Sequence, residues 1–185
     1  MANRIDLFTL IHKGLRRWMG DVSAQLGATD FTDPAAVTVL DDVIACLETL
    51  EAHSAHEETF IAPVLDARSP YRGQPWHAEH ASLDALAESL VRQAQELRAA
   101  GATHSQAAAI GLELYRAFAR FTSEMYLHLD DEETRLMPLL WAVCTDEELA
   151  GILTAFRAAH GPESAVLYAR LATAFTPAER TLLGV

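Results

Sequence analysis

The chain has 185 residues, of which 50% are hydrophobic and 22% charged, and this balance is typical of a globular protein rather than a disordered one. Its formal net charge of −12 argues against nucleic acid as a partner, because phosphates are bound by clustered lysine and arginine, and it also disfavours anionic membrane surfaces. The sequence has no apolar run of ~18 residues, no signal-peptide pattern and two isolated cysteines in apolar surroundings, so we expect one cytoplasmic domain, residues 1–185, without a membrane segment or disulfide.

Apolar residues spaced alternately three and four apart predict four long amphipathic helices. In the first helix an apolar line runs over residues 5–26 and is interrupted by His12. Asp33 is expected to cap the second helix, with Pro34 as its first residue. The apolar line of this second helix extends over residues 39–64 and also contains polar residues of the ligand type.

The third helix is expected to open at Pro75, after a proline- and glycine-rich turn over residues 69–74. Gly101 should end this helix, because glycine readily takes the left-handed conformation of a helix C-terminus. Thr103 and Gln106 fit a capping box at the start of the fourth helix.

Pro63 in the second helix and Pro138 in the fourth should each kink or end their helix within a turn. Because the helices are joined by short loops, we predict an all-α fold, an up-down-up-down four-helix bundle over about residues 4–143. Extra short helices are expected in the C-terminal extension, residues 145–185, which should pack on the bundle, form a homodimer contact or bind a protein partner. Their sequence signals are capping boxes at 145–148 and 176–179 and a stop at Gly161-Pro162.

One motif occurs twice, in the second and fourth predicted helices. Residues 53–65 and 128–140 share a histidine, two successive glutamates, a threonine, a proline and a leucine in the same register. Each copy places a histidine and a glutamate four residues apart, about 40° from each other on a helix: His53 with Glu57, and His128 with Glu132. A carboxylate on a buried line costs several kcal/mol unless it is paired or bound to a metal. The two pairs therefore predict a metal centre inside the bundle.

Three further histidines are candidate ligands because they lie on or beside the buried lines: His12, His77 and His80. The remaining three are expected to lie outside the centre, with His56 in solvent, His104 in a helix cap and His160 at a helix C-terminus. Glu58 and Glu133 point away from the buried lines, so they are expected to be solvated. The alternative is that they hydrogen-bond to a metal ligand on the side away from the metal.

Five imidazoles and two carboxylates form a ligand set that suits iron, because two ions can share two carboxylate bridges. Structural zinc needs four ligands and would leave three of the candidates unused. Ferritin-type di-iron bundles carry Glu-x-x-His, whereas the order here is His-x-x-x-Glu, so that family fits poorly.

Over about residues 4–141 the sequence closely resembles the hemerythrin-like family of HHE cation-binding domains. The resemblance rests on one histidine in the first helix, His-x-x-x-Glu in the second and fourth, and histidines in the third. It implies a non-haem di-iron centre, two Fe ions bridged by an oxo or hydroxo group and by Glu57 and Glu132. It also implies that one iron is held by His77, His80 and His128, and that the other, held by His12 and His53, keeps an open position for O2.

The sequence departs from this family in the third helix. Hemerythrins place their two third-helix histidines four residues apart, whereas His77 and His80 are three apart and Trp76 occupies the place four residues before His80. Either the start of the helix is distorted so that His77 still reaches its iron, or that iron has one ligand fewer.

The resemblance predicts a protein that binds O2 for carriage, storage or sensing, rather than an enzyme. The alternatives are a di-iron redox or stress protein that handles peroxide or nitric oxide, a regulatory module whose metal state controls a partner through the C-terminal helices, and a metal-free bundle.

Overall fold

The computed structural model describes residues 4–101, 106–159 and 165–183, and within these ranges it contains helices and no strand. The all-α prediction is therefore confirmed. Four helices are long: α1 (Thr9–Ala28), α2 (Ala36–Phe60), α4 (Pro70–Ala100) and α5 (Ala107–Asp131). The shorter elements are α3 (Ala62–Arg68), the π-helical turn η1 (Glu132–Leu136), α6 (Met137–Val143), α7 (Asp146–Ala158), α8 (Ala165–Leu171), the 3-10 turn η3 (Ala172–Ala174) and α9 (Pro177–Leu183).

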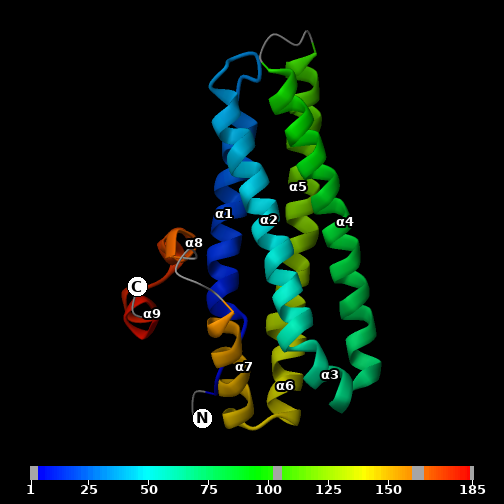
Figure 1. Ribbon diagram of the computed structural model, residues 1–185, viewed down its shortest axis with the longest axis vertical. Coiled ribbons are helices and arrows are strands. Elements are labelled where there is room, and N and C mark those ends of the chain that lie inside the picture. Colours follow the sequence, from blue (N-terminus) through cyan, green and yellow to red (C-terminus); the bar gives the residue numbers. More distant parts are fainter. Residues whose placement is uncertain (1–3, 102–105, 160–164, 184–185) are drawn as a thin grey trace. The chain divides into compact units, whose positions relative to one another are not determined.

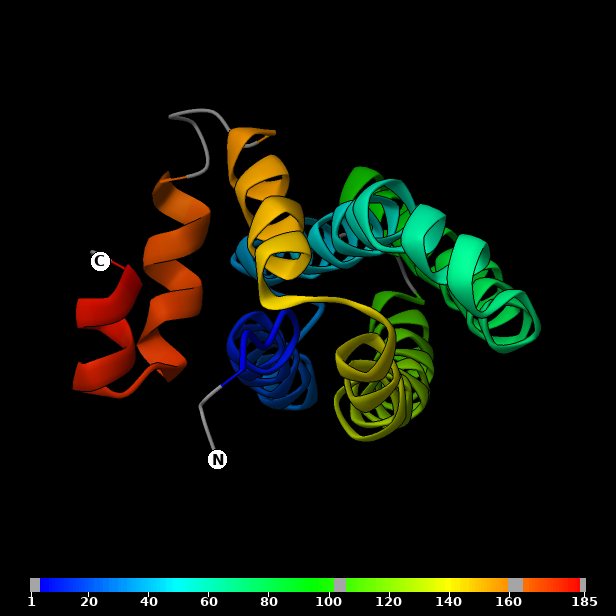
Figure 2. The ribbon, with the colours of Figure 1, turned by 90° about the horizontal axis from the view of Figure 1, so that it is seen from below.

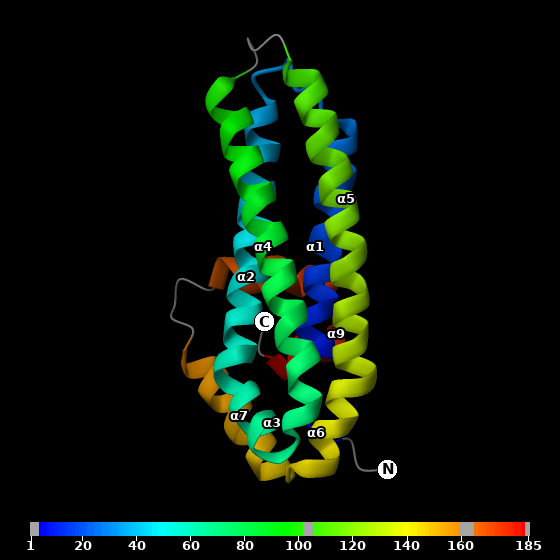
Figure 3. The same cartoon turned by 90° about the vertical axis from the view of Figure 1, so that its right-hand side faces the viewer.

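The chain divides into two compact units, and each contains parts of all four long helices. In the second unit, Trp18–Ser54 and Ala78–Met125, segments of α1, α2, α4 and α5 lie side by side (Figure 1). The first unit consists of Met1–Arg17, Ala55–His77 and Tyr126–Val185. Its helices α3, α6 and α7 gather at one end (Figure 3), and α8 and α9 lie beside α1 (Figure 2). The up-down-up-down order of the four long helices stays a prediction.

The buried side chains follow the apolar lines expected from the sequence. In α1, the residues of the line from Phe8 to Leu26, including His12, are each at most 2% exposed. In α4, the whole line from Trp76 to Leu97 is buried. The first unit has its own apolar core, formed by side chains from α1's N-terminal side, α3, α4, α6 and α7: Phe8, Ile61, Ala62, Leu65, Trp76, Leu136, Met137, Leu140, Cys144 and Leu149.

Most of the expected helix caps are present. The Asp33 carboxylate accepts a hydrogen bond of 2.8 Å from the Ala35 N–H, although α2 begins at Ala36 rather than at Pro34. Gly101 follows the last residue of α4 with φ 70°, and the capping boxes at 145–148 and 176–179 are both formed. Three sequence-based assignments lie outside the described residues: the capping box that starts at Thr103 and includes His104, the helix end at His160, and the stop at Gly161-Pro162.

The expected turn over residues 69–74 is wrong. α4 already begins at Pro70, and Pro75 lies inside the helix. Pro70 supplies the proline that a first helical turn tolerates, so Pro75 is not needed to start the helix. Gly73 allows close packing instead of a turn, because a Cβ there would lie 2.7 Å from Asp66 Oδ1.

The α-helix of the first motif copy ends within a turn of Pro63, as predicted, whereas in the second copy α5 ends about two turns before Pro138, earlier than predicted. α2 ends at Phe60 and α5 at Asp131, and Pro63 and Pro138 lie in the first two positions of α3 and α6. In the second copy the break takes the form of the π-helical turn η1, in which the Met137 N–H donates to the Glu132 carbonyl. A π turn accommodates one extra residue, and such turns often occur at functional sites.

Candidate metal centre

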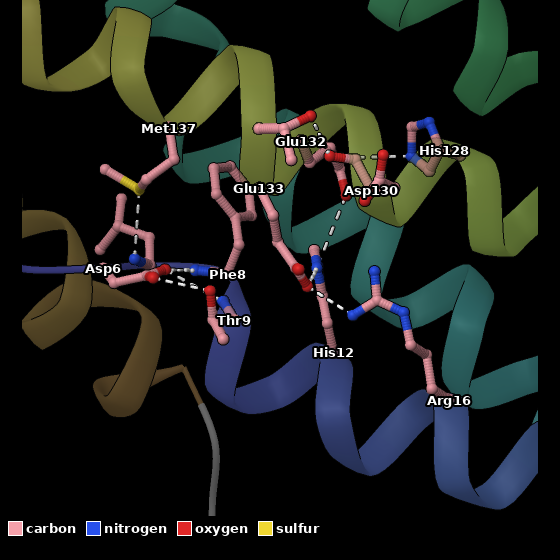
Figure 4. A network of polar contacts seen from close by, with 12 residues as sticks. Asp6, Phe8, Thr9, His12, Arg16, His128, Asp130, Glu132, Glu133 and Met137 are labelled. Atoms are coloured by element: carbon pink, nitrogen blue, oxygen red, sulfur yellow. Dashed lines mark hydrogen bonds and ion pairs between the residues drawn. The ribbon is translucent and has the colours of Figure 1, made fainter.

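The first unit brings ligand-type side chains of α1, α2, α5 and η1 together, and Figure 4 shows those of α1, α5 and η1. His12 is fully buried in α1, whose start is fixed by Asp6 Oδ1, which accepts hydrogen bonds from the N–H groups of Phe8 and Thr9 at 2.9 and 3.0 Å. His12 Nε2 lies 3.4 Å from Glu132 Oε2 and 3.8 Å from Glu57 Oε1. The helix that carries Glu132 also places His128 one turn earlier, 3.2 Å away.

The two oxygens of the Glu132 carboxylate face different histidines. Oε2 lies nearest His12, and Oε1 lies 3.2 Å from His128 Nε2. The Glu132 side chain is 1% exposed, so its charge is removed from water and must be balanced inside the protein. A carboxylate oriented in this way can bind one cation through each oxygen.

Two groups of buried side chains have their ligand atoms within 4.8 Å of one another, and Glu57 and Glu132 belong to both. One group is His12, His53, Glu57 and Glu132, and the other is Glu57, His80, His128 and Glu132. His53 lies one turn before Glu57 in the unbroken helix α2, and His80 lies one turn after Trp76 in α4. Each group offers two imidazoles and two carboxylates, a donor set that fits an iron ion.

Glu133 supports His12 from the opposite edge of the imidazole ring. Glu133 Oε1 lies 2.9 Å from His12 Nδ1 and accepts a hydrogen bond of 2.6 Å from Arg16 Nη1. Glu133 is therefore not simply solvated: its side chain is 19% exposed and contacts a candidate ligand, as in the alternative that the sequence left open. The π turn that begins at Glu132 allows two successive glutamates to reach the two edges of one histidine.

These contacts shift the ionisation of both residues in the metal-free chain. Burial lowers the pKa of His12, but hydrogen bonds to Glu133 and Glu57 and the charges of Glu132 and Glu57 outweigh it and raise the pKa to about 9. Burial raises the pKa of Glu133, and the hydrogen bonds from His12 and Arg16 outweigh this effect, so the net pKa is lowered. A metal ion at His12 would therefore replace a proton.

Trp76 also belongs to the centre, although its role was not foreseen from the sequence. Its indole N–H donates a buried hydrogen bond of 2.7 Å to Glu132 Oε1. The available signal was its position four residues before His80, which places both side chains on one face of α4.

His77 lies outside both groups. Its Nδ1 lies 2.6 Å from Glu58 Oε2 and its Nε2 lies 3.1 Å from Asp66 Oδ1, and the side chain is 30% exposed. Burial lowers the pKa of His77, but the hydrogen bonds to both carboxylates outweigh it and raise the pKa. Because α4 starts at Pro70, His77 lies beyond the first helical turn and does not have the freedom of that turn to face the same way as His80. Glu58, whose side chain is 34% exposed, is therefore a partly solvated partner of His77.

His56 is also outside both groups, but it is half-buried rather than solvated. Its ring packs against Phe60 and against Phe156 of α7, with centroid distances of 6.2 and 5.2 Å. This contact attaches α7 to the end of α2 and requires no metal.

Comparison with known proteins points to the same chemistry as the geometry. Residues 3–140 match the family model of the hemerythrin HHE cation binding domain. No significant match to the chain is found among curated proteins or among solved structures. In the described part of the chain, no helix is long and apolar enough to cross a membrane.

Proposed function

Because the chain belongs to the hemerythrin HHE cation-binding family, we propose that its buried histidines and glutamates hold two iron ions and that the pair binds O2. The observation that carries this proposal is the orientation of Glu132, whose Oε1 faces His128 and whose Oε2 faces His12. Glu57 is the second residue common to both ligand groups, so it is the second proposed bridge. A single bound ion would leave one of the two groups without a role.

In this proposal, one iron is held by His12 and His53 and the other by His80 and His128, and both share the two carboxylates. Two ferrous ions would supply the electrons that O2 binding requires. The protein residues supply fixed ligands in a site closed to bulk water, since each of the six is at most 8% exposed. This closure favours a small ligand such as O2 over a larger substrate.

A second function, the handling of peroxide or nitric oxide by a redox or stress protein, is favoured by the position of His77. With His77 held by Glu58 and Asp66, each ligand group has only two histidines. Both ions would then have room for an exogenous ligand, which suits redox chemistry as well as reversible binding. A homodimer or a protein partner at the C-terminal helices is a further proposal.

Metal analysis with optical spectroscopy tests these functions. Protein purified without oxygen from iron-replete cells should contain about two iron ions per chain. Its spectrum should change on exposure to O2 and return when O2 is removed if the protein is a carrier, store or sensor. Continuous consumption of added peroxide or nitric oxide would favour the second function. A preparation that holds one zinc ion and takes up no iron would contradict both.

A further inference from the structure

We infer that Trp76 is a positioning residue of the centre: it fixes the carboxylate of Glu132 and keeps a further donor away from the ion beside His128. That ion then keeps an open coordination position for a small anion such as azide. The inference rests on the proposed two-ion centre. It goes beyond that function because it explains the open position on the ion beside His128 by a tryptophan, a residue that cannot itself bind the metal.

The hydrogen bond from Trp76 is well placed to hold Glu132. Trp76 is 6% exposed, Glu132 is 1% exposed, and the N–H donates to Oε1 over 2.7 Å. A hydrogen bond to an ionised carboxylate in such surroundings is stronger than one between neutral groups. The indole ring is part of the apolar core of the first unit, where Leu65 and Met137 are at most 1% exposed, so the donor has little freedom to move.

The same oxygen faces the ligand group that contains His128. Glu132 Oε1 accepts from Trp76 and lies 3.2 Å from His128 Nε2, whereas Oε2 faces His12. Rotation of the carboxylate would break the indole hydrogen bond and exchange the oxygens between the two sides. Trp76 therefore holds Glu132 in the orientation that a bridge between two ions requires.

Trp76 also occupies a position from which α4 would otherwise offer a ligand. It precedes His80 by one turn, so its side chain lies on the same face of the helix. An indole N–H is a donor only and has no lone pair for a metal ion. The other candidate on this helix, His77, is engaged by Glu58 and Asp66. The group beside His128 is thus left with four protein ligand atoms, fewer than the six of an octahedral site.

Two substitutions separate the two parts of the inference. Trp76→Phe keeps an aromatic ring and removes the N–H, so metal affinity should fall by about 10- to 100-fold, the usual effect of losing a partner of a metal ligand. Trp76→His offers an imidazole at the open position, so azide should no longer bind to that ion of the pair. The matched control is Trp18→Phe, which removes another buried indole N–H, donated to Asp42 over 3.1 Å in the second unit.

The measurements are made on the full chain loaded with cobalt(II) or iron. Competition with a chelator gives the metal affinity, optical titration with azide gives its affinity and stoichiometry, and circular dichroism checks the fold of each variant. Trp76→Phe with the affinity of Trp18→Phe would overturn the positioning role. If Trp76→His binds azide as the unaltered chain does, the open position is overturned. If that variant does not fold, the stoichiometry of the unaltered chain decides: two azide ions per chain support the open position, and one overturns it. An unaltered chain that takes up no pair of ions would instead overturn the proposed function, and the inference with it.

Discussion

Glu133 Oε1 lies 2.9 Å from His12 Nδ1, on the edge of the imidazole opposite the candidate ligands (Figure 4). In the metal-free chain the raised pKa of His12 keeps both ring nitrogens protonated. If a metal ion replaced the proton on Nε2, the proton on Nδ1 would stay and be donated to Glu133, which would fix the tautomer and leave the Nε2 lone pair for the ion. Arg16 holds the carboxylate from the outer side with a hydrogen bond of 2.6 Å. A short polar chain thus connects the partly exposed Arg16 with the fully buried His12.

Glu133→Ala should therefore weaken metal binding, although Glu133 is not itself in either ligand group. We expect a loss of about 10- to 100-fold in affinity for the ion beside His12, because the ring loses the partner that orients it. Glu58→Ala is the matched control, since Glu58 is the corresponding residue of the first motif copy and contacts His77, which lies outside both groups. Chelator competition measures both variants. Equal affinities for the two variants would contradict the role assigned to Glu133.

Glu57→Ala and Glu132→Ala should each abolish the two-ion centre, because both carboxylates belong to both ligand groups. Metal-loaded protein should also lose thermal stability, since a ligand at a hundredfold excess over its dissociation constant contributes about 2.7 kcal/mol to the folded state. The metal-free variants should lose less, because each substitution also removes a buried charge. Metal content and melting temperature test this, with the exposed Glu51→Ala in α2 and Glu124→Ala in α5 as controls. Controls that lose metal to the same extent would show that the assignment of the buried face is wrong.

The sequence was sufficient to predict the features that depend on helical periodicity. The buried line of α4 from Trp76 to Leu97 and that of α1 around His12 follow from spacing alone, because a helix fixes which residues share a face. The caps at Thr145 and Thr176 are local interactions within four residues, so they too could be read from the chain.

Contacts between helices that are distant in sequence could not be predicted in this way. The hydrogen bond from Trp76 to Glu132 joins residues 56 positions apart, and that between His12 and Glu133 spans 121. The position of Glu133 also depends on the π turn at Glu132–Leu136, which changes the angular relation between neighbours in a way that a regular helical pattern does not contain. For α4, both Pro70 and Pro75 fit a first helical turn, and local sequence preference alone does not distinguish between them.

Gly14→Ala should destabilise the protein, although alanine is the better helix former. In α1 a Cβ at Gly14 would lie 2.7 Å from the Cβ and 3.0 Å from the Cα of Leu171, so α8 would have to move away. The gain of about 1 kcal/mol in helix propensity is smaller than the 1–3 kcal/mol typical of overpacking. Gly151→Ala in α7 is the control, because nothing lies within 4 Å of its added Cβ, and it should stabilise by about 0.5–1 kcal/mol. Denaturant unfolding gives both free energies. A stabilising Gly14→Ala would show that α8 is not packed closely on α1.

His77→Ala is expected to leave the metal content and the optical spectrum of the centre unchanged. The two ring nitrogens face carboxylates, Nδ1 that of Glu58 and Nε2 that of Asp66. A move to an ion beside His80 would break both contacts. Each contact is partly exposed, so its loss should cost little stability, about 0–1 kcal/mol. His80→Ala is the comparison on the same helix and should lose an ion. If His77→Ala also loses an ion, His77 leaves Glu58 and Asp66 when metal binds. The family-like set of three histidines on one iron would then be restored, and the ion beside His128 would have one open position fewer than we infer.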